Sequence, residues 1–510
     1  MRKMTKTVAK ALAVGAVFSI LEPVLRERHY RSEPREPLVW APGSGEKVLL
    51  KNAEIVDVVG GVILHKRGLL MQGGRITDIV TQKNLDGIEA DKVIDVDGLY
   101  VIPGLINAHC HITLPIVLTA GMGILLSMGR QTERNFEECI THGVTTVRDA
   151  GTMPKLMRGY IDRVESGDLL GPRVFSAGAF VNVPGGYPAY LNLPPVLAKK
   201  WGNFLIMPKT AHEASEAVKR NVDWGCNFIK TAFDERTLFM GQKPLPILDD
   251  DQLKAVLKEA HANNVKVSAH HRFRRGFQRA IEFEMDGMEH VSADEVLDDK
   301  EVEAFAAAGC FIVPTAQVGW ALSGYSHGDP YLDDPLVQQS LANRLETIKT
   351  VYPGFCEPAI HKALMKFEKD YRDPSYVERR HLMYTLDPTI FTQALVVGQE
   401  NINKLFHAGA LIGAGNDGGV PQIAPGDLGR ELLLLSQTTD LEPMDALQAG
   451  TINNARILGV EKELGSVEEG KLADLVLLSG NPLECMDHVL YPDAVFKEGK
   501  LLYNTHKIQI

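Results

Sequence analysis

The central part of the chain repeats one pattern, in which an apolar run ends in polar residues and a segment with helical periodicity follows. We count eight such runs between residues 99 and 419, separated by patterns such as LDDDQLKAVLKEAHANN. Buried strands that alternate with helices are typical of βα units around a parallel sheet, so the fold class is α/β. The eight runs are, in chain order, LYVIPGLINAHCH, GVTTVRDAG, PRVFSAG, CNFIKTAFD, VKVSAHH, DGMEHV, CFIVPTAQ and ALIGAGNDGG.

The polar residues at the ends of these runs suggest where chemistry takes place. In a (β/α)8 TIM barrel the C-terminal ends of the strands meet at one face, where side chains from distant parts of the sequence come together. We therefore predict a barrel over residues 103–465 with its site at that face. The candidate residues are His109, His111, Arg148, Asp149, Ser176, Lys230, His270, His290, Thr315 and Asp417.

The two ends of the chain share a different texture, with short β-rich runs punctuated by glycine. Residues 46–102 contain runs such as KVLLKNAEIVDVV, and residues 466–510 contain ADLVLLSGN and DAVFKEGKLLY. Such runs predict strands, and the two ends could pair into one domain with the barrel inserted between them. We expect a small composite β-sandwich.

One connection is too long for a simple barrel. About 100 residues separate Thr315 from Asp417, and the part around residues 320–390 is rich in Tyr and Pro. A long insert at the active-site end of a barrel often forms a lid or shapes the substrate site. A surface helical excursion or an oligomer contact fits the insert equally well.

Charge and cysteine content exclude some functions. The net charge of −11 is spread along the chain without a basic run, which argues against a nucleic-acid partner. The six cysteines are scattered and form no CxxC pair, so we expect reduced core thiols instead of a disulfide framework.

The N-terminal segment, residues 1–35, has two interpretations. A basic head, MRKMTKTVAK, precedes an apolar run, ALAVGAVFSIL, which together have the outline of a signal peptide or membrane anchor. The run is too short to span a bilayer and has no clean cleavage site, so an amphipathic surface helix is the alternative. A cytoplasmic location is slightly favoured, and any membrane contact would come through this segment.

Individual residues indicate metal chemistry, each with an alternative. His109 and His111 lie two apart in a strand and point the same way, which suits chelation, although such a pair can also close a buried strand. Lys230 lies in an apolar strand, where its charge must be paired or removed. Reaction with CO2 would convert it to a carbamate that bridges two metals. Asp417 fits a metal-bound carboxylate better than a phosphate loop, because GAGNDGG lacks the Lys-Ser/Thr ending.

Taken together, these motifs resemble the amidohydrolase superfamily. The resemblance covers roughly residues 47–505 and lies closest to the imidazolonepropionase-like, Xaa-Pro dipeptidase-like and ochratoxinase-like hydrolases. It is carried, in order, by PGLINAHCH, GVTTVRDAG, GPRVFSAG, FIKTA, VSAHH, GMEHV, VPT, GAGNDGG and AGTINNARILGVEKELGSVEEGKLADLVLLSGNPL.

The resemblance implies a distorted barrel, a β-sandwich made from both chain ends and a centre of two divalent metal ions, usually zinc. By similarity, one ion would be held by His109, His111 and Asp417, the other by His270 and His290, with carboxylated Lys230 as the bridge. A hydroxide shared by the ions would attack a carbonyl. Asp417 would take its proton and pass it to the leaving amine.

The chain departs from its relatives in the second shell and in the substrate loop. Asn416 stands where relatives carry Thr or Ser, which could alter a hydrogen bond beside Asp417. Tyr187 stands where relatives carry His, and we treat it as a tentative substrate contact. Arg148 is a second tentative contact, with a buried ion pair involving Arg148 and Asp149 as the favoured alternative. Cys110 lies between two ligands and should face away from them.

The sequence therefore predicts a metal-dependent hydrolase of an amide or peptide-like C–N bond. Its small-molecule substrate would be an N-acyl amino acid, a dipeptide or an aryl amide, and we expect a homo-oligomer. A cyclic amide hydrolase or a deaminase is the second reading, and Lys230 counts against deamination because single-metal deaminases generally lack it. A non-catalytic scaffold of the same fold is disfavoured because all six ligand positions are filled.

Overall fold

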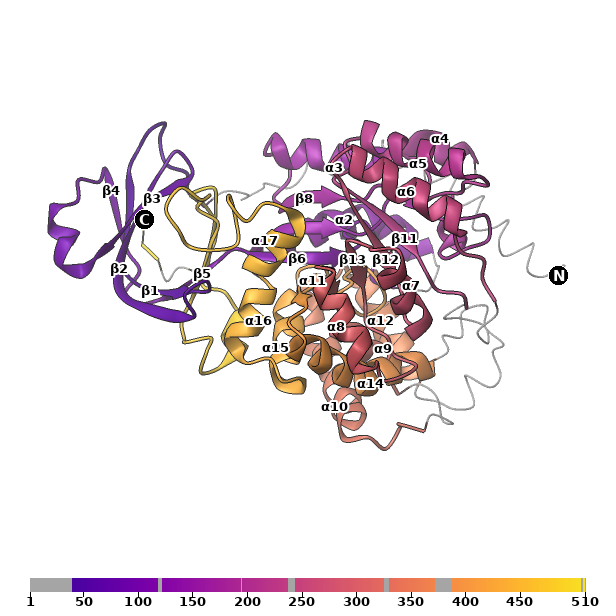
Figure 1. Ribbon diagram of the computed structural model, residues 1–510. Coiled ribbons are helices and arrows are strands. Elements are labelled where there is room, and N and C mark those ends of the chain that lie inside the picture. The colour runs from indigo at the N-terminus through magenta and orange to yellow at the C-terminus, as the bar shows by residue number, and fades with distance from the viewer. Residues whose placement is uncertain are drawn as a thin grey trace.

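The computed structural model describes residues 39–117, 122–193, 195–236, 244–324, 330–371, 388–505 and 508–509. The predicted N-terminal segment, residues 1–35, lies outside the described residues. Figure 1 shows a small sheet at one end of the molecule and a larger body of strands and helices beside it. No helix of the described chain is long and apolar enough to cross a membrane.

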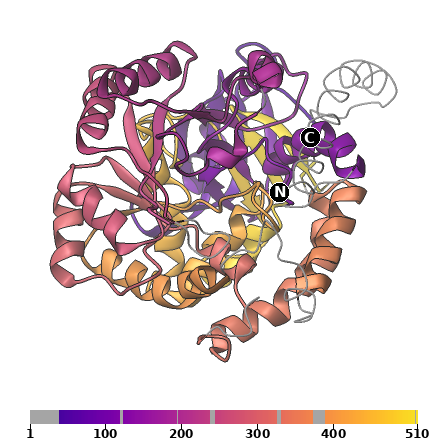
Figure 2. The ribbon, with the colours of Figure 1, turned by 90° about the vertical axis from the view of Figure 1, so that its right-hand side faces the viewer.

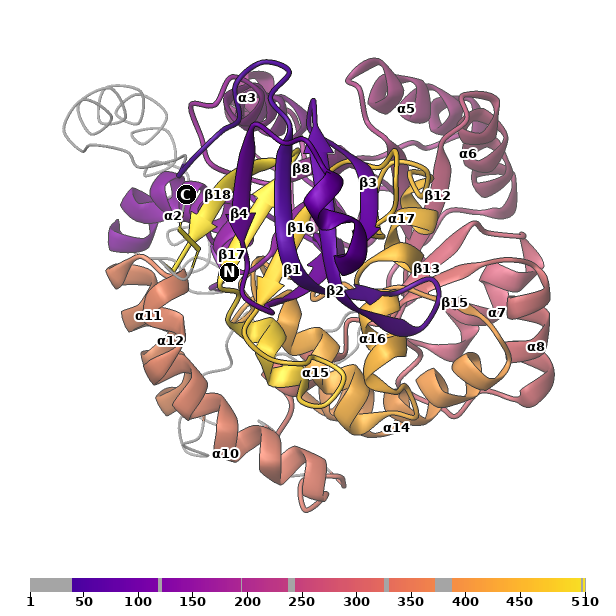
Figure 3. The ribbon, with the colours of Figure 1, turned by 90° about the vertical axis from the view of Figure 1, so that its left-hand side faces the viewer.

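The small part is one eight-stranded sheet built from both ends of the chain (Figure 3). β5 (Tyr100–Pro103) pairs antiparallel with β16 (Leu475–Leu478), which joins segments far apart in the sequence. The strand order is β18-β17-β16-β5-β1-β2-β3, and β4 pairs with β1. The other strands are β1 (Val48–Asp57), β2 (Val62–Gln72), β3 (Arg75–Thr81), β4 (Lys92–Asp95), β17 (Ala494–Lys497) and β18 (Lys500–Asn504).

This chain-end sheet has a core of its own. Apolar side chains of both chain ends meet in one buried cluster, which includes Leu50, Leu69, Leu475 and Phe496. Burial of large apolar side chains is the main source of stability for such a sheet. The division of the strands into two packed layers, a sandwich, stays a prediction.

All eight predicted strand runs of the larger part contain a strand. The first run is split, because LYVIP forms β5 of the chain-end sheet and only the segment after Gly104 forms β6. The strands are β6 (Leu105–Cys110), β7 (Val144–Asp149), β8 (Arg173–Ser176), β11 (Phe228–Ala232), β12 (Lys266–His270), β13 (Gly287–Glu289), β14 (Phe311–Val313) and β15 (Leu411–Ile412); a short pair, β9 (Phe180–Val181) and β10 (Leu205–Ile206), lies between β8 and β11 in sequence.

The strands pair in parallel in sequence order. β6-β7-β8 form one sheet and β11-β12-β13-β14-β15 another. The chain after β15 returns to β6, since Ala108 N donates to Ala414 O at 3.0 Å and Asp417 N donates to His109 O at 2.8 Å. Asn227 N donates to Ser176 O at 2.8 Å between β8 and the start of β11. Closure into a complete (β/α)8 barrel stays a prediction.

Helices surround these strands (Figure 2). Their starts follow ordinary capping rules: Asp249 and Gln252 form a capping box at α6, and Thr210 accepts the Glu213 N–H at α5. The helices outside the insert are α2 (Met122–Thr141), α3 (Pro154–Glu165), α4 (Pro195–Trp201), α5 (Ala211–Asp223), α6 (Asp250–Ala262), α7 (Arg274–Glu282), α8 (Asp299–Ala307), α15 (Leu428–Thr438), α16 (Pro443–Ala449) and α17 (Ile452–Leu458).

The long insert is helical where the structure describes it. Its helices are α9 (Ala316–Leu322), α10 (Pro335–Thr350), α11 (Tyr352–Phe355), α12 (Pro358–Tyr371) and α14 (Pro388–His407), and α10–α12 lie along one flank of the larger part (Figure 3). A fully buried ion pair, Arg344 Nε to Glu368 Oε2 at 3.3 Å, joins α10 to α12. Arg344 Nη1 also donates to Trp320 O at 3.0 Å, which ties the insert to α9.

Candidate metal centre

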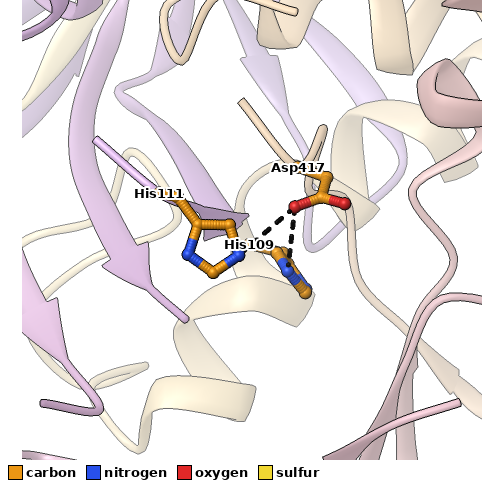
Figure 4. Close-up of side chains that lie close together, drawn as sticks. All are labelled: His109, His111 and Asp417. Atoms are coloured by element: carbon orange, nitrogen blue, oxygen red, sulfur yellow. Dashed lines mark ion pairs between the residues drawn. The ribbon is translucent and has the colours of Figure 1, made fainter. Parts of the chain in front are cut away.

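Three predicted ligands converge in one buried group (Figure 4). His109 lies in β6, His111 follows that strand, and Asp417 follows β15. Asp417 Oδ1 lies 3.3 Å from His109 Nε2 and 3.4 Å from His111 Nε2. One ligand atom from each residue lies within 4.8 Å of the others, so these three side chains could hold a common metal ion. We call them the first ligand group.

Hydrogen bonds fix which nitrogen of each histidine faces Asp417. His109 Nδ1 lies 2.7 Å from Glu289 Oε2, and His111 Nδ1 lies 2.9 Å from Gly151 O. Both acceptors favour the tautomer with the proton on Nδ1, and in that neutral tautomer Nε2 offers its lone pair to a metal. Histidines that bind metals are held by an outer acceptor in this way.

The glycines of GAGNDGG bring the chain after β15 against β6. A Cβ on Gly415 would lie 2.5 Å from His109 N, and one on Gly419 would lie 2.1 Å from His111 O. Both positions therefore require glycine for close packing of the two segments. This packing explains the glycine-rich loop without a phosphate.

Asn416 supports the loop through a small hydrogen-bond network. Its Oδ1 accepts Asn107 Nδ2 at 2.8 Å and Gly418 N at 2.9 Å, and its Nδ2 donates to Ala424 O at 2.8 Å. A Thr or Ser side chain has a single polar atom, so it could not replace both the Oδ1 and the Nδ2 of Asn416 in this network. Asn416 and Asn107 thus form an amide pair that holds this loop against β6.

A second ligand group lies beside the first and consists of Lys230, His270 and His290. His270 Nδ1 and His290 Nε2 lie 2.8 Å apart, facing each other. The outer nitrogens have their own partners: His270 Nε2 lies 2.8 Å from Asp234 Oδ2, and His290 Nδ1 lies 2.7 Å from Thr315 Oγ1. The rings of His109 and His290 are 4.7 Å apart, so the two groups adjoin.

Lys230 is fully buried in β11. Its Nζ has no hydrogen-bond partner among the described residues, and the nearest carboxylate oxygen, Glu289 Oε1, is 3.6 Å away. Burial lowers the pKa of Lys230 to about 7, with the positive charge of Arg148 adding to the effect of burial. A substantial share of the amine is therefore neutral at neutral pH.

Glu289 is the central residue that sequence reasoning missed. It is fully buried, and its carboxylate accepts Arg148 Nη1 at 2.6 Å, Ser268 Oγ at 2.6 Å and the ring nitrogen of His109. Although burial alone would raise it, the pKa of Glu289 is held well below its usual value by Arg148, Lys230 and His109. A charged residue in the apolar run DGMEHV was a signal of the same kind as Lys230.

Arg148 forms a buried ion pair with Glu289, not with its neighbour Asp149. Arg148 also donates to Ser268 Oγ at 2.9 Å and lies over the ring of Phe228. Asp149 points the other way along β7 and accepts the Ile112 N–H at 3.0 Å. The Arg148 guanidinium thus has protein partners, and a contact between Arg148 and substrate stays a prediction.

Tyr187 lies at the second ligand group. Its ring stacks on His270, with centroids 4.1 Å apart and planes at 25°. This position is compatible with the predicted substrate contact, which stays a prediction. Asp234, the outer partner of His270, is a second residue that the sequence analysis did not single out.

Cys110 faces away from the ligands, as expected. It belongs to the main buried apolar cluster, and burial raises the pKa of its thiol well above the usual value. All six cysteines are free, and five of them are buried.

The protonation states suit metal binding. Burial lowers the pKa of His111 to about 4 and that of His290 well below 6.5, so both imidazoles are neutral near pH 7. Burial opposes ionisation of Asp417, but His109, His111 and Arg272 outweigh it and lower its pKa to about 2. Neutral imidazole and ionised carboxylate are the forms that ligate divalent metals.

Several buried polar atoms of the candidate ligands have no hydrogen-bond partner in the described part of the chain, which also fits a metal site. His109 Nε2, Asp417 Oδ1 and Lys230 Nζ are buried and have no hydrogen-bond partner within the described residues. Three side chains at this site also have a positive φ that such residues rarely adopt: His290 (70°), Thr315 (53°) and Asp417 (57°). Unpaired buried atoms and strained backbone both concentrate at functional sites.

Comparison with known proteins identifies the family. A family model described as "Amidohydrolase family" matches residues 100–502, and the chain belongs to this family. The ochratoxinase of Aspergillus niger is 24% identical over 496 residues, which cover 92% of this chain and 89% of the relative. A candidate prolidase from Bifidobacterium longum has a TM-score of 0.65 at 26% identity and covers 91% of this chain and 96% of its own.

A further solved structure shares the fold. A prolidase complexed with N-methylphosphonate-L-proline has a TM-score of 0.68 at 21% identity and covers 90% of this chain and all of its own. The family membership implies a TIM-barrel-like α/β fold and, in general, the use of metal ions. With these relatives it supports an enzyme that hydrolyses amide or peptide-like C–N bonds.

Proposed function

We propose that this protein is a binuclear metal-dependent amidohydrolase that cleaves an amide or peptide-like C–N bond of a small molecule. The observation that carries the proposal is the buried first ligand group, in which His109 Nε2, His111 Nε2 and Asp417 Oδ1 converge. The second ligand group adjoins it and offers two more ring nitrogens, 2.8 Å apart. Five ligands and a buried lysine thus lie in one small volume.

The first ion would be held by His109, His111 and Asp417, and the second by His270 and His290, with Lys230 between them. Imidazole and carboxylate ligands suit zinc, and they do not separate it sharply from Mn, Fe or Co. When bound, the ions would polarise the substrate carbonyl and lower the pKa of water.

Lys230 would act as a carbamate. Its neutral amine would form a new N–C bond to CO2 and release one proton, which gives an anionic group with two oxygens. The carbamate nitrogen would keep one N–H, and Glu289 Oε1, 3.6 Å from Nζ, is the nearest carboxylate oxygen of the described residues. The positive Arg148 beside Glu289 offsets the added negative charge.

Asp417 would handle protons. Its ionised carboxylate has one oxygen, Oδ1, toward the two histidines, while Oδ2 lies 4.0 Å from His290 Nδ1. Oδ2 is therefore placed to accept the proton of the attacking water and to return it to the leaving amine. The low pKa of Asp417 keeps the carboxylate in the accepting form.

The relatives suggest the substrate class. The names prolidase and ochratoxinase describe those proteins, and by similarity we propose an N-acyl amino acid, a dipeptide or an aryl amide for this chain. The complete (β/α)8 barrel over residues 103–465 and the composite sandwich of residues 46–102 and 466–510 belong to the same proposal. The insert at 320–390 would be part of the barrel domain.

Metal analysis combined with a substrate screen tests this function. Purified protein should contain about two divalent ions per chain and should cut members of a panel of N-acyl amino acids, dipeptides and aryl amides; lactams test the alternative. Lys230→Ala should lose metal and activity, and Asp417→Asn should lose activity. Asp440→Asn, which alters an exposed His–Asp pair, is the matched control. Protein without metal, or a fully active Asp417→Asn, would refute the proposal.

A further inference from the structure

One buried cation beside the metal centre has no role in the chemistry described so far. Arg272 follows β12, two residues after His270, and is only 2% exposed. Its Nε and Nη1 have no hydrogen-bond partner anywhere in the described chain. An arginine is always charged, and a buried charge without a partner costs several kcal/mol of stability (about 3–5 when a pair is broken). A bound anion would supply the missing partner of this charge.

The guanidinium lies within electrostatic range of the candidate metal centre. Its strongest favourable electrostatic interaction is with Asp417, followed by Asp234 and Tyr187, and its charge also acts on His290. These residues belong to both ligand groups or to their immediate surroundings. Arg272 is therefore close enough to both ligand groups to act on a substrate bound there.

Neither nearby carboxylate satisfies Arg272. Within the described residues no direct ion pair joins the guanidinium to Asp417 or Asp234. Asp417 Oδ1 lies against His109 and His111, and Asp234 Oδ2 lies against His270. Both acids lie against candidate ligand histidines, so no carboxylate of the described residues serves as the counterion of Arg272.

The backbone of Arg272 is held firmly in place. Its N–H donates to Asp234 Oδ1 at 2.8 Å, and its carbonyl accepts the Ala293 N–H at 2.9 Å. A fixed backbone reduces the entropy cost of orienting the guanidinium toward a ligand. The residue is thus built into the site and is not a mobile surface side chain.

The surroundings of Arg272 add an apolar wall. Its guanidinium carbon lies 5.6 Å from the ring centre of Phe391 on α14. Phe391 belongs to a buried cluster with Phe273, Val318 and Trp320, against which Tyr187 packs. A ligand that carries an acid group next to an apolar group would match both features.

We propose that Arg272 binds a carboxylate of the substrate close to the scissile bond. The preferred substrates are then amides with a free acid, namely N-acyl amino acids or dipeptides with an apolar side chain, and not neutral aryl amides or lactams. The inference rests on the proposed amide hydrolysis and narrows its substrate class. A guanidinium can bind a carboxylate through two parallel N–H···O bonds, which an amide or ester group cannot replace.

Matched substrate pairs test Arg272 directly. Each N-acyl amino acid and dipeptide is compared with its C-terminal carboxamide, and cleavage of the same inner amide bond is followed in zinc-loaded protein. Wild type should prefer the acid of each pair. In Arg272→Met, kcat/KM for the acids should fall by about 100-fold or more, as expected for loss of one partner of a buried charge pair, while the carboxamides should change little. Arg272→Lys keeps the positive charge but lacks the paired N–H donors of the guanidinium. Its kcat/KM for the acids should therefore recover only part of the loss seen in Arg272→Met.

A control variant and a binding measurement keep the outcome unambiguous. Arg279→Met removes another buried arginine, whose guanidinium contacts Leu248 O and Asp250, and should retain the preference for acids. Calorimetric binding of the same acids to wild type and Arg272→Met does not depend on turnover. Metal content, measured in every variant, should stay at the wild-type level in Arg272→Met.

The possible results separate this inference from the proposed function. If wild type cuts neutral amides but prefers no acid, amide hydrolysis stands and the assignment of Arg272 is wrong. If wild type cuts nothing but binds acids, and Arg272→Met loses that binding, the assignment stands and the proposed function is wrong. Equal losses for acids and carboxamides, a lost preference in Arg279→Met, or no binding of acids at all would overturn the role of Arg272.

Discussion

In both ligand groups each histidine has an outer partner at one ring nitrogen, but the inward ring nitrogens face different atoms in the two groups. In the first group both Nε2 atoms face a carboxylate, Asp417, at 3.3 and 3.4 Å. In the second group the inward nitrogens of His270 and His290 face each other at 2.8 Å, so one of them must carry a proton unless a cation lies between them. An ion could therefore bind the first group without displacing a proton, whereas an ion bound at the second group would displace the proton between the two rings.

The outer partners differ as well. His109 relies on Glu289, a carboxylate that also accepts Arg148 and Ser268, whereas His270 relies on Asp234, and His290 on the Thr315 hydroxyl. A partner shared by several donors links metal binding to the stability of the whole strand region. A partner that contacts only one candidate ligand should affect mainly the affinity for the metal ion. Variants of these partners should therefore separate stability from metal affinity.

The largest effect is expected from Glu289→Gln. The change removes the charge that compensates buried Arg148, so the free energy of unfolding should fall by about 3–5 kcal/mol in urea unfolding of metal-free protein. Metal affinity should fall by about 10–100-fold because His109 loses its carboxylate partner. Glu463→Gln breaks an exposed ion pair with Arg75 and should cost less than about 1 kcal/mol. Similar losses in both variants would contradict the central role of Glu289.

A pH effect of intermediate size is expected from His111. Its pKa is about 4 in the folded protein because of burial, against 6.5 in an unfolded chain. Between these values the unfolded chain binds a proton that the folded chain does not, so the free energy of unfolding falls as pH drops from about 6.5 to 4. The full effect is roughly 3 kcal/mol. In metal-free His111→Asn this part of the pH dependence should disappear; an unchanged slope would show that His111 is not held neutral.

Asp234→Asn should affect the second ion and spare the first. His270 would lose its charged outer partner, so titration of metal-free protein should show weaker binding of one ion by about 10–100-fold with the other unchanged. The unfolding free energy should change less than in Glu289→Gln. Asp440→Asn removes a similar carboxylate from exposed His407 and should leave both ions unaffected. Equal weakening of both ions would mean that the two groups do not act separately.

The smallest effect is expected from Thr315. In Thr315→Ala, His290 loses a neutral hydroxyl partner, which is worth about 0.5–1.5 kcal/mol, or up to about tenfold in affinity for the second ion. Thr315→Ser keeps the hydroxyl and should bind the second ion as wild type does. Metal titration of the two variants side by side measures the difference. A serine variant as weak as the alanine variant would show that the hydroxyl is not the relevant contact.

Many of the strands could be predicted because each forms a short apolar run that is visible in the local sequence. Each of the eight predicted runs contains a strand, and the four candidate histidines lie at or near strand ends or directly after them. Lys230 lies in the middle of β11, and Asp417 lies in the loop that follows β15. The split of the first run was less visible, since LYVIP and LINAHC are equally apolar and only Gly104 separates them. Whether a strand belongs to one sheet or another depends on its partners, which local pattern does not contain.

The site could be predicted less completely, and the misses have a common cause. Glu289 and Arg148 are 141 positions apart, and neither run alone shows that one compensates the other. Asp234 and Arg272 follow predicted strand ends but match no metal motif, so nothing in the sequence marked them. The candidate ligands could be recognised from motifs and their order in the sequence. Their outer partners come from other strands and can be identified only in the folded structure.

The junction at Gly104 has a mechanical consequence. β5, held in the chain-end sheet by β16, passes through this one residue into β6, which carries His109. A Cβ on Gly104 would lie 2.3 Å from Thr145 Oγ1 and 3.0 Å from Asp474 Cβ, so the chain is tightly packed at this junction. Separation of β16 from β5 would therefore be expected to displace His109, the candidate ligand that β6 carries.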